Sequence, residues 1–136
     1  MTKLLAATMV VGLTIVSAIA QPLAIVKVPF GFRVGNTELP AGSYEIEAVA
    51  MNAVRITNVE NRSVAVAINP IPITRSDAST YPAKLVFNRY GRHCYLSEIW
   101  SSGSLTGRAV PKSEREAELA KRIQPVHIDL ITTSRP

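Results

Sequence analysis

The sequence predicts an all-β protein: an antiparallel β-sandwich or small barrel of six or seven strands with one C-terminal helix. Three observations predict it. Apolar and polar residues alternate at period two in several short segments, which is the pattern of half-buried strands. Turn-forming residues such as glycine, proline and asparagine separate these segments. Helix signals gather in one late segment, and many strands followed by a single helix favour packed antiparallel sheets.

The first predicted strand covers residues 26–34, because every second residue from Val26 to Val34 is apolar. Pro29 cannot donate a hydrogen bond to a neighbouring strand, so we expect an edge strand or a bulged one. Gly35 and Asn36 then predict a turn. Residues 39–42, Leu-Pro-Ala-Gly, predict a second turn.

Three more strands follow in the first half of the chain. Residues 43–50 alternate strongly, with Tyr44 and Ile46 on the apolar side. Residues 53–59 alternate more weakly, with Val54 and Ile56 inward. Residues 64–68 are continuously apolar, which favours a central strand that is covered on both sides.

Two segments predict loops. Residues 69–83 interrupt the alternation with three prolines among polar residues. A connection of this length is unusual in a compact domain, so residues 70–83 are either a plain loop or a functional lid. Residues 103–111, which contain two glycines, also predict a loop.

Residues 84–90 and 93–100 predict a β-hairpin with Gly91-Arg92 as its turn, since glycine at the first central position suits a type II′ turn. With a two-residue loop Tyr90 faces His93, and the pairing continues to Lys84 opposite Ile99. Successive residues on a strand point to opposite faces. We expect the core face to carry Leu85, Phe87, Cys94, Leu96 and Trp100, with Arg89 and Glu98 near the rim.

The opposite face of this hairpin is the candidate binding surface. It carries Asn88, Tyr90, His93 and Tyr95, and Arg92 in the turn adds a cation. Clustered, exposed tyrosines are common at contact sites because they offer a large, stiff and amphipathic area. We interpret these five residues as a partner-binding patch. The alternative is that a second sheet or the predicted helix covers it.

The predicted helix spans residues 113–123. Ser113 and Glu116 have the spacing of a capping box. Leu119 and Ile123 form a narrow apolar stripe, so we expect the helix to lie on the sheet by one thin face.

Residues 1–20 have the layout of a secretory signal peptide: Lys3, an apolar run over residues 4–20, and Ala-Ile-Ala at 18–20 as cleavage signal. An uncleaved anchor is the alternative, although it needs roughly 20 apolar residues. We therefore expect an exported protein, periplasmic or secreted, that touches the membrane only if this segment stays uncleaved.

Cleavage would leave 116 of the 136 residues, which suits one domain. We expect this domain to cover residues 21–131, with 126–131 as a candidate last strand and 132–136 as a frayed tail. Cys94 is the only cysteine, so no intramolecular disulfide can form, and we expect a buried thiol.

The chain is basic, with 15 Lys and Arg against 10 Asp and Glu. These cations are scattered and form no run. A soluble basic surface is the simplest interpretation, and a patch for anionic lipid head groups or polyanions is the alternative. No recognisable nucleic-acid motif is present, so we expect no nucleic-acid partner.

Residues that could do chemistry do not gather into a recognisable site. His93 and Cys94 are neighbours on a strand, point to opposite faces and cannot form a catalytic dyad. His127 and Asp129 share a face and could ligate a metal with His93, but they lack a metal-site spacing. We expect no catalytic residue, no metal site and no cofactor.

Five short motifs lie at residues 28–32, 39–44, 85–91, 95–100 and 107–114. Together they resemble a family of small exported proteins found mainly in acidobacteria. The resemblance covers roughly residues 1–120, and residues 124–136 extend past the point where such proteins often end. It implies export but no chemistry, because the family has no assigned catalytic residues.

The sequence therefore favours a non-enzymatic binding or envelope-associated module, whose partner is an envelope protein, a glycan or a second copy of the chain. Two alternatives remain open. One is a carrier of a small apolar ligand inside a β-barrel, and the other is a hydrolase with an unrecognised site.

Overall fold

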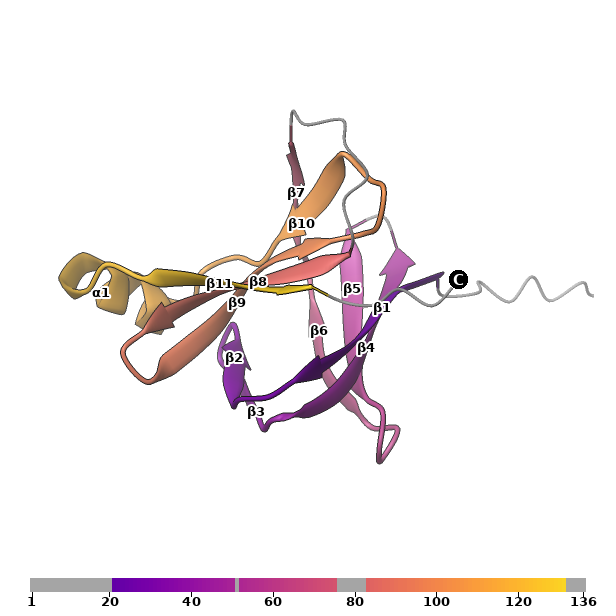
Figure 1. Cartoon of the computed structure of the whole chain (residues 1–136), viewed down its shortest axis with the longest axis horizontal. Helices are drawn as coiled ribbons and strands as arrows, with labels where there is room; N and C mark the ends of the chain where they lie inside the picture. Colours follow the sequence, from indigo (N-terminus) through magenta and orange to yellow (C-terminus); the bar gives the residue numbers. More distant parts are fainter. Residues whose placement is uncertain (1–20, 51, 76–82, 132–136) are drawn as a thin grey trace, which may run out of the picture.

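The computed structural model describes residues 21–50, 52–75 and 83–131, which form two β-sheets and one helix (Figure 1). The predicted signal segment 1–20 and the predicted tail 132–136 lie outside the described residues. So do residues 76–82 of the predicted lid.

The smaller sheet has four antiparallel strands in the order β1-β4-β5-β6. Their bounds are Gln21–Val28 for β1, Gly42–Ala50 for β4, Ala53–Asn58 for β5 and Val64–Ile68 for β6. Val54 and Ile56 point inward and are fully buried, as predicted. On the outer face of this sheet, Glu47 of β4 forms an ion pair with Arg55 of β5.

The larger sheet has the order β11-β8-β9-β10-β7, and β2 and β3 lie off this path. Only the contact of β2 with β9 is parallel among the described strands. The mainly antiparallel two-sheet fold is thus confirmed, and the described strands do not close into a barrel. The bounds are Phe32–Val34 (β2), Thr37–Leu39 (β3), Ile71–Thr74 (β7), Lys84–Tyr90 (β8), His93–Trp100 (β9), Thr106–Ala109 (β10) and Val126–Ile131 (β11).

The predicted strand over residues 26–34 is two strands, one in each sheet. β1 ends at Val28, and β2 begins at Phe32 in the other sheet, after three intervening residues. Pro29 has no N–H with which to continue the ladder to β4, so the chain leaves the sheet there. The alternation of apolar and polar residues continues from β1 into β2, because the apolar side chains of both strands point into the same core. Its buried members are Val26, Val28, Phe32 and Val34.

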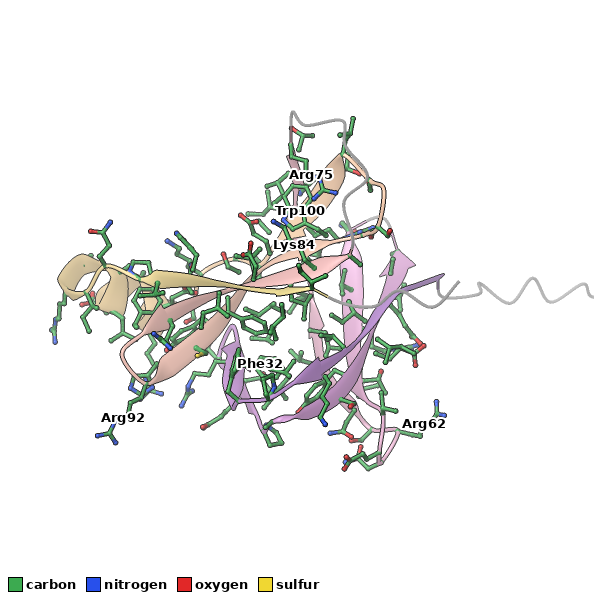
Figure 2. All side chains as sticks on the ribbon, in the orientation of Figure 1. Phe32, Arg62, Arg75, Lys84, Arg92 and Trp100 are labelled. Carbon is green, nitrogen blue, oxygen red and sulfur yellow. The ribbon has the colours of Figure 1, made fainter. Side chains whose placement is uncertain are left out.

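Aromatic rings fill the space between the two sheets. Phe87 of β8 meets Phe30 and Phe32 edge-to-face, with ring centroids 5.1 and 5.5 Å apart. Phe32 also meets Tyr44 of the smaller sheet at 5.3 Å. Edge-to-face pairs of this kind stabilise by about 0.5–1.5 kcal/mol beyond the area that they bury. Figure 2 shows Phe32 between the sheets.

Three predictions about the intervening segments are wrong. Residues 64–68 form β6 at the edge of its sheet and not at the centre. Residues 71–74, within the predicted loop 69–83, form β7, and residues 106–109 of the other predicted loop form β10. β7 and β10 pair with each other. The backbone hydrogen bonds of a distant partner decide such short strands, and local alternation cannot show them.

The β8–β9 hairpin forms as predicted at its turn, where Tyr90 pairs with His93 and Gly91 has a φ of 62°. Farther along, a β-bulge at position 97 shifts the register, so that Lys84 pairs with Trp100 and not with Ile99. The bulge turns Ile99 into the cluster between the sheets, whereas Trp100, which is buried as predicted, lies outside that cluster. Leu85, Phe87, Cys94 and Leu96 are core residues as predicted.

Helix α1 spans Glu114–Arg122 and lies near the turn of the β8–β9 hairpin (Figure 1). Ser113 is the N-cap and accepts a hydrogen bond from the Glu116 backbone N–H at 3.2 Å, as predicted. The chain then returns along β8 as β11, which confirms the candidate last strand.

The Trp100 ring lies over Gly107 of β10, and the Arg75 guanidinium carbon lies 4.7 Å from the ring centroid (Figure 2). A Cβ on Gly107 would come within 2.5 Å of this ring. We therefore expect Gly107→Ala to lower the free energy of unfolding by roughly 1–3 kcal/mol, the usual range for overpacking. Denaturant unfolding measures this change.

Gly42→Ala is the matched control, since Gly42 is also in a strand and its added Cβ would meet its nearest neighbour at 3.8 Å. We expect a much smaller change there. Equal effects of the two substitutions would show that the Trp100 contact does not restrict position 107.

Candidate functional site

A buried carboxylate joins helix α1 to the larger sheet. Glu116 is the buried residue of α1, with 3% of its surface exposed. The predicted apolar stripe contributes less, because Leu119 is half-buried and Ile123 is 43% exposed. The contact between helix and sheet therefore depends mainly on polar groups.

Glu116 accepts hydrogen bonds from two residues of β8. The Tyr90 hydroxyl donates to its Oε2 at 2.9 Å, and the Asn88 amide donates to the same oxygen at 3.4 Å. The Asn88 amide also lies 3.4 Å from the Ser97 hydroxyl oxygen. We call Glu116, Tyr90, Asn88, Ser97 and His127 the Glu116 cluster.

His127 of β11 completes the cluster. Its Nδ1 lies 2.7 Å from the Asn88 Oδ1. An amide oxygen only accepts, so with the Asn88 amide nitrogen turned toward Glu116, Nδ1 carries the proton. Three elements of the larger sheet and helix α1 therefore meet in one hydrogen-bonded group.

Burial and the neighbouring carboxylate change the acidity of Tyr90. Desolvation is the main cause, and the hydrogen bond to Glu116 adds to it; together they raise the pKa of Tyr90 to about 12. The phenol therefore stays protonated at neutral pH and acts as a hydrogen-bond donor to Glu116.

The predicted partner-binding patch is not an exposed surface. Asn88 is 4% exposed, and Tyr90 and Tyr95 are 1% exposed. Tyr90 and Tyr95 pack edge-to-face at 5.9 Å, and the Tyr95 hydroxyl has no hydrogen-bond partner among the described residues. The helix covers this face because Glu116 reaches the polar residues of β8.

The other two residues of the predicted patch, Arg92 and His93, are exposed at the hairpin turn. Arg92 extends away from the body of the molecule (Figure 2). The structure thus separates the five residues into three that are buried, of which Asn88 and Tyr90 contact the helix, and two at the turn.

An open hollow of about 460 Å³ lies between the C-terminal end of α1 and the larger sheet. Lys112, Lys121 and Arg122 line it, with Gln124 and the edge of Tyr90. Lys121 also pairs with Glu118 at 3.3 Å, and both side chains are largely exposed. We call this the basic hollow. It offers two ammonium groups, a guanidinium and the Gln124 amide to a ligand.

The other chemically reactive residues remain apart. Cys94 is buried while its neighbour His93 is exposed. Burial raises the pKa of the Cys94 thiol, although Arg89 opposes this shift. His127 bonds to Asn88, and Asp129 pairs with Lys84 at 3.5 Å. Within the described ranges, no three His, Cys, Asp or Glu side chains are placed to hold a metal ion.

Comparison of the chain with protein-family models, with curated proteins and with solved structures finds no match. Over residues 21–50, 52–75 and 83–131, no helix has the length and apolarity needed to cross a membrane.

The sequence analysis missed the role of Glu116 beyond its place in the capping box. A signal was present, because Glu116, Leu119 and Ile123 are spaced to lie on one helix face. An acid on the apolar stripe indicates a polar partner beneath the helix. Lys112 could not be found this way, since its place at the hollow depends on how the helix docks.

Tyr90→Phe tests the Glu116 cluster. This substitution removes the hydroxyl and leaves the buried Glu116 Oε2 with only the longer hydrogen bond from Asn88. We therefore expect the free energy of unfolding to fall by about 1–3 kcal/mol at pH 7. Denaturant unfolding measures it. Because the pKa of Tyr90 is higher in the folded protein than in the unfolded chain, its protonated hydroxyl stabilises the fold. This stabilisation is complete at pH values below 10.0, the ordinary pKa of tyrosine, and disappears as the pH rises through about 12. The difference between the two proteins should therefore shrink over that window.

Glu118→Gln is the control, because Glu118 is an exposed acid on the same helix. Its effect should stay within about 0.5 kcal/mol. A Tyr90→Phe protein as stable as the parent would contradict the assigned role of this hydrogen bond.

Proposed function

We propose that the protein is an exported, non-enzymatic binding module that holds an anionic group of the cell envelope in the basic hollow. The observation that carries the proposal is the convergence of Lys112, Lys121 and Arg122 on one concave surface. Two of these cations come from the last turn of α1, and the third precedes the helix. Such a surface raises the local concentration of anions.

Charge and shape both support binding over catalysis. The hollow is open, and its lining contains no His, Cys, Asp or Glu. Its ligand chemistry is a phosphate or carboxylate group, which accepts hydrogen bonds from Lys, Arg and Gln. The apolar-carrier alternative needs an enclosed apolar cavity, and Phe30, Phe32 and Phe87 fill the space between the sheets.

Export is part of the same proposal. It rests on the signal-peptide layout of residues 1–20, with Ala-Ile-Ala at 18–20 before Gln21. The module would then meet envelope ligands outside the inner membrane.

We expect mature protein from the envelope fraction to begin at Gln21, and intact-mass measurement determines its first residue. Recovery of the full-length chain from the inner membrane would contradict cleavage and favour the anchor.

Lys112→Gln with Lys121→Gln tests the hollow. Sedimentation binding to vesicles containing phosphatidylglycerol measures affinity, and phosphatidylcholine vesicles give the background. Each lysine near an anionic surface contributes about 1 kcal/mol, so the double variant should bind roughly thirtyfold more weakly. Inorganic phosphate as competitor distinguishes recognition of the phosphate group from recognition of a charged membrane.

Lys27→Gln with Arg62→Gln is the matched control. Both residues are exposed, neither lines the hollow, and the net charge falls by the same two units. This variant should retain most of the affinity. Equal losses in the two double variants would show that the whole basic surface, and not the hollow, attracts the vesicles.

A further inference from the structure

One sheet edge lacks the features that normally prevent pairing with another chain. Natural edge strands are protected by proline or by charged side chains. Among the described edges, β1 contains Pro22 and Lys27, β7 contains Pro72, and β11 contains Asp129. β6, Val-Ala-Val-Ala-Ile, contains neither proline nor charge.

The uncharged character extends past β6. No charged residue occurs between Arg62 and Arg75, a stretch of twelve residues. The remaining chain is basic, so two copies repel each other over most of their surfaces. The β6 edge is where a second copy can approach without bringing like charges together.

Within the described part of the chain, the core is incompletely covered beside β6. Val66 and Ile68 pair with the inward residues Ile56 and Val54, and they pack against the core. Both nevertheless remain only half-buried, whereas Val54 and Ile56 are fully buried. A strand added beyond β6 would cover these two side chains. Val64, which is 56% exposed, marks the start of the same edge.

We propose that β6 pairs antiparallel with β6 of a second copy about a twofold axis at Ala67. In this register Val66 of each copy lies opposite Ile68 of the other, so inward apolar side chains meet on one face. The two four-stranded sheets then form one eight-stranded sheet. The two cores become continuous, and the backbone groups of both β6 edges, which have no strand partner among the described residues, are satisfied.

A twofold contact of this kind needs a segment that complements itself. β6 is such a segment, because its core-facing residues are aliphatic and it contains no charged residue that would meet its own copy in the paired strand. The occupant is therefore a second copy and not a charged strand of another protein.

Cross-linking at the axis is the direct test. Directly opposite residues in antiparallel strands have Cα atoms about 4.5–5.5 Å apart, within the range that a disulfide spans. Ala67→Cys should form a disulfide-linked dimer on mild oxidation. The parent protein has only the buried Cys94 and should not. Asp129→Cys, on the exposed edge β11, is the matched control and should give little cross-linked product.

A charge exchange at the same position tests the interface without a covalent bond. Like charges directly opposite each other destabilise strand pairing. Ala67→Glu alone and Ala67→Lys alone should each raise the dimer dissociation constant about tenfold or more, measured by sedimentation velocity over a concentration series. An equimolar mixture of the two variants should restore the dimer, because opposite charges then face each other.

Folding is checked separately in each variant by circular dichroism. In the β5–β6 register position 67 lies beside Arg55, so a glutamate there has a cation as its neighbour. A parent protein that stays monomeric up to millimolar concentration overturns the proposal. So does a dimer that both charge variants leave intact, since its interface would lie elsewhere. Slow hydrogen exchange of the β6 backbone amides in a monomeric protein would show that another segment of the same chain pairs with β6. That result would also overturn the proposal.

Discussion

The contact of Phe32 with Phe87 and Tyr44 is the interaction on which the two-sheet arrangement depends. Phe87 belongs to a strand in the interior of the larger sheet and Tyr44 to an inner strand of the smaller one. Phe32 lies between them on β2, directly after the chain has crossed from one sheet to the other. Its ring therefore fixes the separation of the sheets at the crossing. The Tyr44 hydroxyl, which donates to the Pro40 carbonyl at 2.6 Å, anchors the turn before β4 to the same group.

Prolines stand at all three described places where the chain changes sheet. Pro29 separates β1 from β2, Pro40 separates β3 from β4, and Pro70 separates β6 from β7. A proline has no N–H, so a hydrogen-bonded ladder ends there and the chain can leave its sheet. The last of these crossings leaves β6 and β7 as edge strands of different sheets. The exposure of the β6 edge thus follows from the same local chemistry that builds the sandwich.

The β8–β9 hairpin has two buried faces of opposite character. One face is aliphatic and aromatic and belongs to the core, whereas the other carries Asn88 and Tyr90 and needs a polar cover. Burying these groups without partners would cost free energy, so the helix that covers them must supply an acceptor. Glu116 is that acceptor. Hydrogen bonds are directional, so the two bonds to Glu116 orient α1 on the sheet. In this orientation Lys121 and Arg122, in the last turn of the helix, line the hollow.

The sequence by itself determined the features that depend on neighbouring residues. The hairpin turn at Gly91, the Ser113 cap, the inward Val54 and Ile56 and the buried Cys94 all follow from local periodicity and conformational preference. The tertiary structure decided which distant segments meet. It paired β7 with β10, placed β6 at an edge, brought Ile99 and not Trp100 into the cluster between the sheets, and placed Glu116 of the helix against Asn88 and Tyr90. These outcomes depend on long-range hydrogen bonds and on one β-bulge. The alternation of apolar and polar residues along the sequence reveals neither of them.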